Sequence, residues 1–381
     1  MAKKVLICTS HFQPNVGGVE THLNDLTKAL TLRGWNVYVA TYKPLARNID
    51  VKLYEEKGRL KIYRMPWPGF NIVHLLTPYP PLEFLYLFPG LFIINFLVLL
   101  RNPDIGVIHS QGLVPGVVGL VLAKIFGKRV VVSTHNLYFF PKTGLYKDFS
   151  KIVLSGVDVV LALSAQSLEE IRGLGVSKHK VKPFRYWLDL KLFKPLKINS
   201  RKRGMSVFFV GRLIETKGVN VLLNVAKDKR LRKVNFVFAG LGPLEDSLKL
   251  AARKYRNISY LGPLKPEEVR KQMNESDLVA VPSTVDEGYG RVAMEAIACG
   301  TPVLAAKRGG LNEVVADEVG WLERPNSEVF SDKLVKLMRN KSEIKKKSSK
   351  ARKYALNYFS EKNVLQIINE YINDNDQKKQ Y

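Results

Sequence analysis

The sequence predicts an α/β protein built from two parallel-sheet units in tandem, and three observations support this fold class. Short β-branched runs alternate with amphipathic stretches over most of the 381 residues. The alternation falls into two series, joined near residues 185–204 by a link that ends in the basic, polar piece KINSRKRG. A chain of this length also exceeds what one hydrophobic core usually fills. We therefore expect one domain over residues 1–185 and another over residues 186–359.

The first series contains short apolar runs that read as buried strands, with helical patterns between several of them. In the first helical pattern, Leu23, Leu26 and Leu30 share one face, and Gly34 ends the helix. The predicted strands are VLICTS (5–10), NVYVAT (36–41), LKIYRM (60–65), IGVIHS (105–110), RVVVST (129–134) and DVVLALS (158–164).

The second series repeats this organisation and ends in helices, roughly residues 327–374, that are rich in lysine and glutamate. Doubly wound sheets bind ligands at the carboxyl ends of their strands, so two such sheets facing each other predict a cleft. The predicted strands are MSVFFVG (205–211), VNFVFAG (234–240), ISYLG (258–262), DLVAVPS (277–283), TPVLAA (301–306) and VGWL (319–322).

The composition limits the classes of protein to consider. A formal net charge of +26 attracts polyanions such as anionic lipid or phosphate-bearing substrates. No stretch combines basic and aromatic residues in a nucleic-acid-binding module, so we expect no nucleic-acid partner. The two cysteines, Cys8 and Cys299, read as buried thiols in a reducing compartment. The N-terminus reads as a strand rather than a signal peptide, which indicates a cytoplasmic protein.

Two stretches suggest a peripheral contact with an anionic membrane. Residues 84–100, FLYLFPGLFIINFLVLL, carry no charge and approach the length of a membrane span, but Pro89 and Gly90 interrupt them. We expect a buried or interfacial helix whose apolar face could rest on lipid at the inner face of the membrane, with a true membrane span as the alternative. The basic cluster at residues 341–353 is read as a solvated helix face, with membrane contact as the alternative.

The stretch VDEGYGRVAMEAIACGTPVLA (285–305) carries two spaced glutamates. Gly288 and Gly290 disfavour a helix, so the helix is expected to start near Gly290–Arg291 and to stop at Gly300. Glu287 then precedes the helix and Glu295 lies about 1.5 turns into it. The helix start offers free N–H groups to a phosphate, while the two carboxylates accept hydrogen bonds from hydroxyl pairs. This is the outline of a nucleotide-sugar site. A capping glutamate and a solvated helix glutamate are the alternative reading.

Further motifs follow other strands of the second series. FVGRLIETKG (209–218) places Arg212 and Lys217 where two cations could neutralise a diphosphate without a metal. AGLGPLED (239–246) contributes Gly240 and Gly242 but lacks the third glycine of the dinucleotide fingerprint, so no nicotinamide cofactor is expected. YLGPL, which ends at Leu264, could offer backbone groups to a base.

The first domain has candidate ligand-binding motifs of its own. PNVGGVE (14–20) lets Gly17 and Gly18 bring backbone close to a ligand. STHN ends one strand with His135, and HSQG ends another with His109. A single histidine at a strand end is usually structural, but two at one sheet edge favour a site.

Together with RGGLNEVV, these motifs resemble family 4 of the retaining, nucleotide-sugar-dependent glycosyltransferases, in the order usual for that family and over most of the chain. The resemblance implies the GT-B architecture, in which two Rossmann-like doubly wound domains face a central cleft. It also implies a hexosyltransferase that takes a hexose-type sugar from a UDP- or GDP-sugar, needs no metal or other cofactor, and retains the anomeric configuration.

The resemblance also implies roles for individual residues. His135, Arg212, Lys217 and Glu287 would be catalytic. The first domain would bind the acceptor, and a last helix over residues 360–375 would pack back on it. The donor would be bound by Gly17, Gly18, Gly240, Gly242, Leu264, Gly288, Tyr289, Gly290 and Glu295, with Glu295 on the ribose.

The acceptor and the link are less well defined by the resemblance. The apolar run and the net charge favour the hydroxyl of a lipid-linked or membrane-associated glycan. A soluble sugar or small-molecule acceptor, or a catalytically inactive GT-B scaffold, are the alternatives. The family usually has a Pro-Asn-Gly-Val-Asp turn in the link, where this chain has FRYWLD (184–189), with Tyr186 and Trp187 in place of Asn-Gly.

Overall fold

The computed structural model describes residues 3–15, 17–45, 49–69, 72–76, 79–135, 137–198 and 204–372. The chain forms two compact units. Unit 1 is Met1–Trp187 together with Lys362–Tyr381, and unit 2 is Leu188–Glu361. The chain therefore passes from one unit to the other twice, after Trp187 and after Glu361. Of the segment expected to return to the first domain, residues 373–375 lie outside the described part.

Unit 1 contains an eight-stranded sheet in the order β3-β4-β2-β1-β5-β6-β7-β8. Neighbouring strands are parallel except for the β3–β4 hairpin. The six predicted strands all form. The two others were missed because β3 is a polar edge strand, YEEK, and β8 is only three residues long. The strands are β1 Lys4–Cys8, β2 Asn36–Tyr42, β3 Tyr54–Lys57, β4 Leu60–Met65, β5 Val107–Gln111, β6 Arg129–Thr134, β7 Val159–Ala162 and β8 Val181–Pro183.

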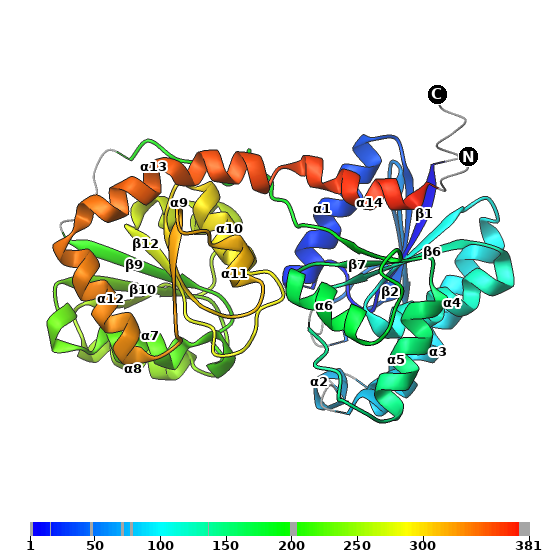
Figure 1. Ribbon diagram of the computed structural model, residues 1–381, viewed down its shortest axis with the longest axis horizontal. Helices are drawn as coiled ribbons and strands as arrows, with labels where there is room; N and C mark the ends of the chain where they lie inside the picture. Colours follow the sequence, from blue (N-terminus) through cyan, green and yellow to red (C-terminus); the bar gives the residue numbers. More distant parts are fainter. Residues whose placement is uncertain are drawn as a thin grey trace. The chain divides into compact units, whose positions relative to one another are not determined.

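Helices cover both faces of this sheet. One core, which includes Leu6, Ile108 and Val132, lies between the sheet and α3, α4 and α5. The C-terminal segment, drawn in red, belongs to the same unit as the blue N-terminal elements (Figure 1), and its Tyr371 packs edge-on against Trp35. The helices are α1 Gly18–Leu32, α2 Ile72–Leu76, α3 Pro80–Arg101, α4 Leu113–Phe126, α5 Leu145–Gly156, α6 Ala165–Gly173 and α14 Leu365–Ile368, with 3-10 turns η3 Glu361–Val364 and η4 Asn369–Tyr371.

The α3 helix continues through Pro89 and Gly90, so the expected interruption at these residues is wrong. A proline inside a helix removes one backbone donor and crowds the preceding turn. Here the Tyr42 hydroxyl enters the opened turn, accepts a hydrogen bond from Leu91 N–H at 2.9 Å and donates one to the Leu87 carbonyl. Gly90 leaves room for this, because a Cβ there would lie 2.6 Å from the Tyr42 ring.

Unit 2 contains a six-stranded, wholly parallel sheet in the order β11-β10-β9-β12-β13-β14. All six strands predicted for the second series form. They are β9 Met205–Val210, β10 Val234–Ala239, β11 Ile258–Tyr260, β12 Leu278–Val281, β13 Val303–Ala306 and β14 Gly320–Glu323.

Helices again lie on both faces, with α9 and α10 on one side of the sheet and α7, α8 and α12 on the other (Figure 1). The expected helix start near Gly290–Arg291 is confirmed, since α10 begins at Arg291 and Gly300 follows its end with φ +80°. The helices are α7 Val219–Ala226, α8 Glu245–Lys254, α9 Pro266–Glu275, α10 Arg291–Ala298, α11 Leu311–Val314, α12 Ser327–Arg339 and α13 Lys341–Tyr358, with 3-10 turns η1 Glu215–Lys217 and η2 Lys229–Leu231.

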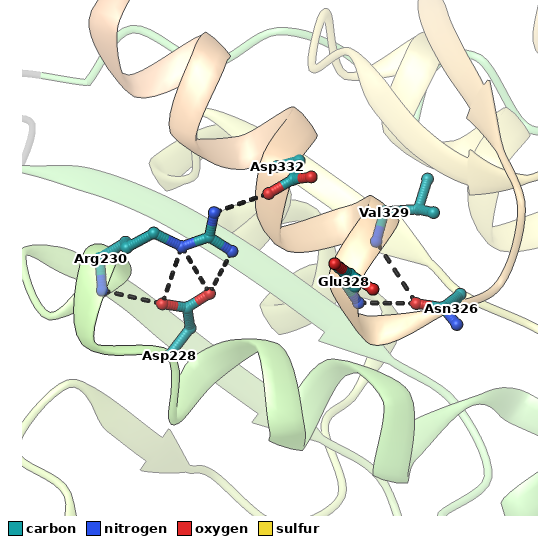
Figure 2. Close-up of polar contacts among 6 residues, drawn as sticks. All are labelled: Asp228, Arg230, Asn326, Glu328, Val329 and Asp332. Carbon is teal, nitrogen blue, oxygen red and sulfur yellow. Dashed lines mark hydrogen bonds and ion pairs between the residues drawn. The ribbon is translucent and has the colours of Figure 1, made fainter.

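Polar contacts hold α12 against η2, the 3-10 turn that follows α7, and cap the start of α12. Figure 2 shows Arg230 bridging Asp228 and Asp332, while the Asn326 side chain accepts hydrogen bonds from the first N–H groups of α12. Arg230 and Asp332 are about half exposed, so their ion pair contributes little to stability. The cap contributes about 1 kcal/mol.

The basic cluster at residues 341–353 lies on α13, and two of its cations are structural. Lys347 is buried and bonds the Asp317 carbonyl, while Arg352 donates to the carbonyls of Phe193, Ala298 and Leu190. Arg352 thereby ties the start of unit 2 to its last long helix.

Candidate functional site

The strand order of unit 2 places its ligand site. From β9 the chain proceeds to β10 on one side, whereas β12 pairs with β9 on the other. After β9 and after β12 the chain therefore continues toward opposite sides of the sheet, and open α/β sheets bind ligands at such a point. The motif FVGRLIETKG runs through the loop after β9 and PSTVDEGYG through the loop after β12.

Lys217 and Glu287 bring these two loops together. Lys217 Nζ lies 2.6 Å from Glu287 Oε1, and the Ser283 hydroxyl donates a hydrogen bond to the same oxygen. The Lys217 and Glu287 side chains are mostly buried, at 27 % and 15 % exposure. Among the described residues no polar contact involves Glu287 Oε2, which leaves one carboxylate oxygen to accept from a ligand hydroxyl. The sequence did not single out Ser283, because a serine after a strand carries no distinguishing signal.

Gly218 makes the approach of the two loops possible. Its φ of +72° lies in the left-handed region, and an added Cβ would stand 1.9 Å from the carbonyl oxygen of Pro282. Beside it, Thr284 N–H donates to the Thr216 carbonyl at 3.0 Å. The glycine of the motif therefore serves loop packing, and it ends η1 and begins α7.

The loop from Glu287 to Gly290 rests on a second pair of glycines. Gly310 N–H donates to the Glu287 carbonyl at 2.8 Å, and a Cβ on Gly309 would lie 2.5 Å from that oxygen. Gly290 has φ +80° and caps the N-terminus of α10. Tyr289 is buried, so it anchors this turn by packing. The glycines of RGGLNEVV thus form the surface that supports the predicted donor loop.

Glu295 lies within α10, and Arg291 Nε lies 3.2 Å from its Oε1. The two side chains are mostly buried, at 14 % and 11 % exposure. Glu295 is therefore not the solvated helix glutamate of the alternative reading. The sequence spacing of four residues could have indicated this ion pair.

The glycines after β10 also bring loops together. Gly240 has φ +134°, and a Cβ on it would lie 1.8 Å from the Gly211 carbonyl oxygen. A Cβ on Gly242 would lie 2.6 Å from the Leu213 carbonyl oxygen. Arg212 lies between these contacts with an exposed side chain that makes no ion pair among the described residues, so its charge is available to an anion. Leu264 is half-buried between β11 and α9.

In unit 1 the strand order reverses between β1 and β5. Gly17 caps α1 with extended backbone, and the Glu20 carboxylate folds over it. Next to Gly18 nothing lies within 4 Å of where a Cβ would stand, so this glycine faces open space. Both glycines are at the carboxyl edge of the sheet, as their position in the sequence predicts.

His135 follows β6 at the same edge and is 7 % exposed. Its Nε2 lies 2.7 Å from Gln111 Oε1, and its Nδ1 lies 2.8 Å from the Tyr186 hydroxyl. Burial lowers the pKa of His135 to about 3, so the ring is neutral at physiological pH. Neither Gln111 nor Tyr186 stood out in the sequence as a partner of this histidine.

His109 does not end its strand as expected, because β5 continues to Gln111. Its ring is buried, with Nδ1 2.7 Å from the Tyr371 hydroxyl and Nε2 2.7 Å from Ser133 Oγ. His109 thus holds the returning C-terminal segment against the sheet. This structural role could not be read from the sequence, because its partner Tyr371 is 262 residues away.

The cysteines and the metal-binding residue types form no further site among the described residues. Cys8 and Cys299 are free and buried, which confirms that both thiols lie in the interior. Within the described ranges, no group of three or more His, Cys, Asp or Glu side chains is arranged to hold a metal ion.

Comparisons with known proteins agree with the motifs. Residues 16–190 match the family described as Glycosyltransferase Family 4, and residues 193–357 match Glycosyl transferases group 1. The chain is 27 % identical over 334 residues to the phosphatidylinositol N-acetylglucosaminyltransferase gpi3 subunit of Schizosaccharomyces pombe, covering 85 % of this chain and 70 % of that protein. It is 29 % identical to an uncharacterized glycosyltransferase of Methanocaldococcus jannaschii, with 84 % of each covered.

Solved structures show the same fold. Sucrose-phosphate synthase from Thermosynechococcus elongatus superposes with a TM-score of 0.80 at 20 % identity, covering 99 % of both chains. Anabaena HepE, solved in complex with UDP, superposes with a TM-score of 0.75 at 21 % identity, covering 96 % of this chain and 98 % of that one. At these identities the likeness establishes the fold, which is GT-B.

Proposed function

The chain belongs to the glycosyltransferases of family 4 and group 1, and on this basis we propose that it transfers a hexose from a UDP- or GDP-sugar to a hydroxyl of a membrane-associated glycan. The anomeric configuration is retained. The observation that carries the proposal is the cluster of Lys217, Glu287 and Ser283 between the loops that follow β9 and β12. It combines a cation for phosphate with a carboxylate for sugar hydroxyls at the expected ligand position of the sheet.

Each part of the donor, namely the sugar, the diphosphate and the ribose, is bound by a residue type that suits its chemistry. Glu287 Oε2 accepts from hydroxyls of the sugar, while Lys217 and the exposed Arg212 bind the diphosphate. Glu295 accepts from the ribose hydroxyls. Backbone groups at Gly288 and Gly290, near the N-terminus of α10, face the ligand. HepE, which shares this fold, was solved with UDP and with UDP-glucose.

The reaction breaks the bond between the sugar's anomeric carbon and the diphosphate oxygen. The bonding electrons leave with the diphosphate, where Lys217 and Arg212 stabilise the growing negative charge. The acceptor hydroxyl then bonds to the oxocarbenium-like carbon from the face that the leaving group occupied. Its proton passes to the departing diphosphate, so the atoms balance without an added base.

Product analysis tests this reaction. We expect the protein to release UDP or GDP from one nucleotide-sugar in the presence of extracted membrane glycolipids and without divalent metal. The new glycosidic linkage, read by NMR, should have the anomeric configuration of the donor. An inverted linkage would contradict retention, and absence of nucleotide release from every UDP- and GDP-sugar would contradict the transferase proposal.

A membrane-associated acceptor is supported by the outward face of α3. Leu82, Leu85, Pro89, Ile93, Leu97 and Leu100 recur at intervals of three or four residues, and all are exposed. A surface helix normally has polar residues on its outer face. Here the exposed stripe is wholly apolar along a helix of 22 residues, which is about 33 Å long.

The apolar surface continues onto α5. The Phe84 and Phe149 rings meet edge to face at 5.6 Å, and Leu145 and Ile152 extend the surface with exposures of 89 % and 68 %. Lysines flank these residues, including the exposed Lys142 and Lys151. Apolar insertion and attraction to anionic headgroups add together in peripheral membrane binding.

The same helix is long and apolar enough to cross a membrane, but the residues on its inner face pack into the core of unit 1. Leu87, Leu91, Asn95, Val98 and Leu99 are buried, and the Tyr42 hydroxyl bonds the helix backbone. Removing α3 into a bilayer would expose this core. We therefore propose that α3 lies in the plane of the membrane interface. Two relatives named phosphatidylinositol N-acetylglucosaminyltransferase subunits support a membrane-associated acceptor.

Vesicle sedimentation tests the membrane contact. We expect the wild-type protein to sediment with phosphatidylglycerol-containing vesicles at low salt, and Leu85→Asp combined with Leu100→Asp to reduce binding at least about tenfold. The matched control is Leu32→Asp with Leu250→Asp, two leucines of similar exposure outside the stripe. Equal binding by both double variants would contradict the proposed surface.

A further inference from the structure

An aromatic loop, residues 137–144, follows β6 at the carboxyl edge of the unit 1 sheet. Glu170 holds this loop, because its carboxylate accepts hydrogen bonds from Tyr138 N–H at 3.0 Å and from Phe140 N–H at 3.3 Å. The Tyr138 ring stacks on Phe140 with centroids 5.2 Å apart. A Cβ on Gly112, which follows β5, would lie 3.6 Å from the Tyr138 hydroxyl oxygen. The loop thus borders the edge at which open α/β sheets bind ligands.

The two helices of the exposed apolar surface, α3 and α5, border the same loop. Phe140 packs against Tyr146 of α5 with ring centroids 5.8 Å apart, and the first turn of α3 meets α5 edge to face. Burial raises the pKa of the Tyr146 hydroxyl, and the nearby negative charges of Glu83 and Glu170 raise it further. Glu83, in the first turn of α3, therefore lies close to both the loop and α5.

Glu83 is the only acidic residue of α3, and it is half-buried. Among the described residues, no hydrogen bond or ion pair involves its carboxylate. Burial raises the pKa of Glu83, because the charged form has lost water and no described donor replaces it. Such a carboxylate is stabilised by a ligand that donates hydrogen bonds. A net charge of +26 disfavours a cationic ligand, so hydroxyl groups are the donors expected here.

Phe139 exposes an aromatic ring on the loop, between the two stacked rings. Its side chain is 66 % exposed, and its φ of +50° lies in the left-handed region, which is uncommon for a residue with a large side chain. Residues held in such conformations cluster at ligand sites. An exposed aromatic ring in the same loop region as a carboxylate and a phenol suits a ligand that has an apolar face and several hydroxyls.

We propose that Glu83, the Tyr146 hydroxyl and the Phe139 ring bind the polyhydroxylated ring in the headgroup of the membrane acceptor. This rests on the proposed function, in which the acceptor is membrane-associated. Glu83 accepts hydrogen bonds from ring hydroxyls, and Phe139 covers the apolar face of the ring. The outward face of α3 carries the apolar stripe, and its first turn carries Glu83. A headgroup at the bilayer surface can therefore reach the carboxyl edge of β5 and β6 while its lipid stays in the membrane.

The experiment is sedimentation of the full chain with three kinds of vesicle. The first contains phosphatidylglycerol. In the second, phosphatidylinositol replaces it, which has the same charge but carries a polyhydroxylated ring. The third contains phosphatidylglycerol and extracted membrane glycolipids. The wild type should bind at least one of the two ring-bearing vesicles about tenfold more tightly than the first, and Glu83→Gln should bind all three as the wild type binds the first.

Two further variants separate recognition of the ring from contact with lipid. Phe139→Leu keeps an apolar side chain but removes the aromatic face, so it should bind the first vesicle as the wild type does and lose about threefold of the preference for the ring. Glu169→Gln is the matched control for Glu83→Gln, because it removes a carboxylate from an exposed position of the same unit. It should keep the full preference.

A wild-type protein that binds the three vesicles equally, or binds none of them, would overturn the inference. So would a Glu83→Gln protein that keeps the wild-type preference. The binding result does not depend on catalysis. A wild-type protein that prefers ring-bearing vesicles but releases no nucleotide from any UDP- or GDP-sugar would contradict the proposed function separately, while the headgroup site would stand.

Discussion

Replacing Gly218 by alanine is expected to lower the free energy of unfolding by more than about 4 kcal/mol and to abolish nucleotide binding. The new Cβ would stand 1.9 Å from the Pro282 carbonyl oxygen, and a φ of +72° is unfavourable for any residue with a Cβ. The loops after β9 and β12 would be forced apart. Because Lys217 and Glu287 lie on those loops, the ion pair between them would open as well.

Gly262 is a close control for this substitution. Its φ is +73°, but nothing lies within 4 Å of where its Cβ would stand. Gly262→Ala should therefore lower the free energy of unfolding only by the cost of a left-handed backbone conformation, about 1–2 kcal/mol. The free energies of unfolding of the two variants, measured with denaturant, differ by the contribution of the steric clash. Similar losses of stability in the two would show that the loops are not in contact through Gly218.

Glu287→Gln is expected to reduce kcat/KM for the nucleotide-sugar about 100-fold or more. The amide keeps the shape of the side chain but removes the charge that pairs with Lys217 and that we propose accepts from the sugar hydroxyls. Each charge-assisted hydrogen bond contributes about 1.5–3 kcal/mol, and every 1.4 kcal/mol corresponds to about tenfold. The measurement is nucleotide release under steady-state conditions.

The control for this prediction is Glu318→Gln, which removes the same charge at an exposed position away from the β9 and β12 loops. It should turn over at the wild-type rate. The fold of Glu287→Gln should be intact by circular dichroism, since glutamine keeps the size and shape of the glutamate side chain. A wild-type kcat/KM for Glu287→Gln would show that the charge of Glu287 takes no part in the reaction.

The architecture of both units could be predicted from the sequence because each central strand is an apolar run long enough to be distinctive. Two features, the β3 strand and the continuity of α3, could not be predicted in this way. The β3 edge strand is polar and pairs with only one neighbour, so it carries no hydrophobic signal. The continuity of α3 through Pro89 depends on Tyr42, which lies on a strand 47 residues earlier in the sequence and cannot be paired with the helix from local pattern.

The sequence singles out candidate site residues but does not show their contacts. Lys217 and Glu287 were singled out separately, yet their ion pair follows only from the adjacency of β9 and β12. A glycine after a strand can make room for a ligand or for a neighbouring loop, and Gly218 and Gly240 each pack against the carbonyl of a neighbouring loop. Only long-range pairing distinguishes these two uses of a glycine.

The measurement that tests the central claim most directly is calorimetric titration of the wild-type protein and of Glu295→Ala with UDP and with GDP, in the absence of divalent metal. We expect one of the two nucleotides to bind the wild type and the variant to bind it at least about tenfold more weakly, because charge-assisted hydrogen bonds to the ribose are lost. That result would identify the base of the donor. Binding of neither nucleotide by the folded wild-type protein would contradict the assignment of the β9 and β12 loops as a nucleotide-sugar site.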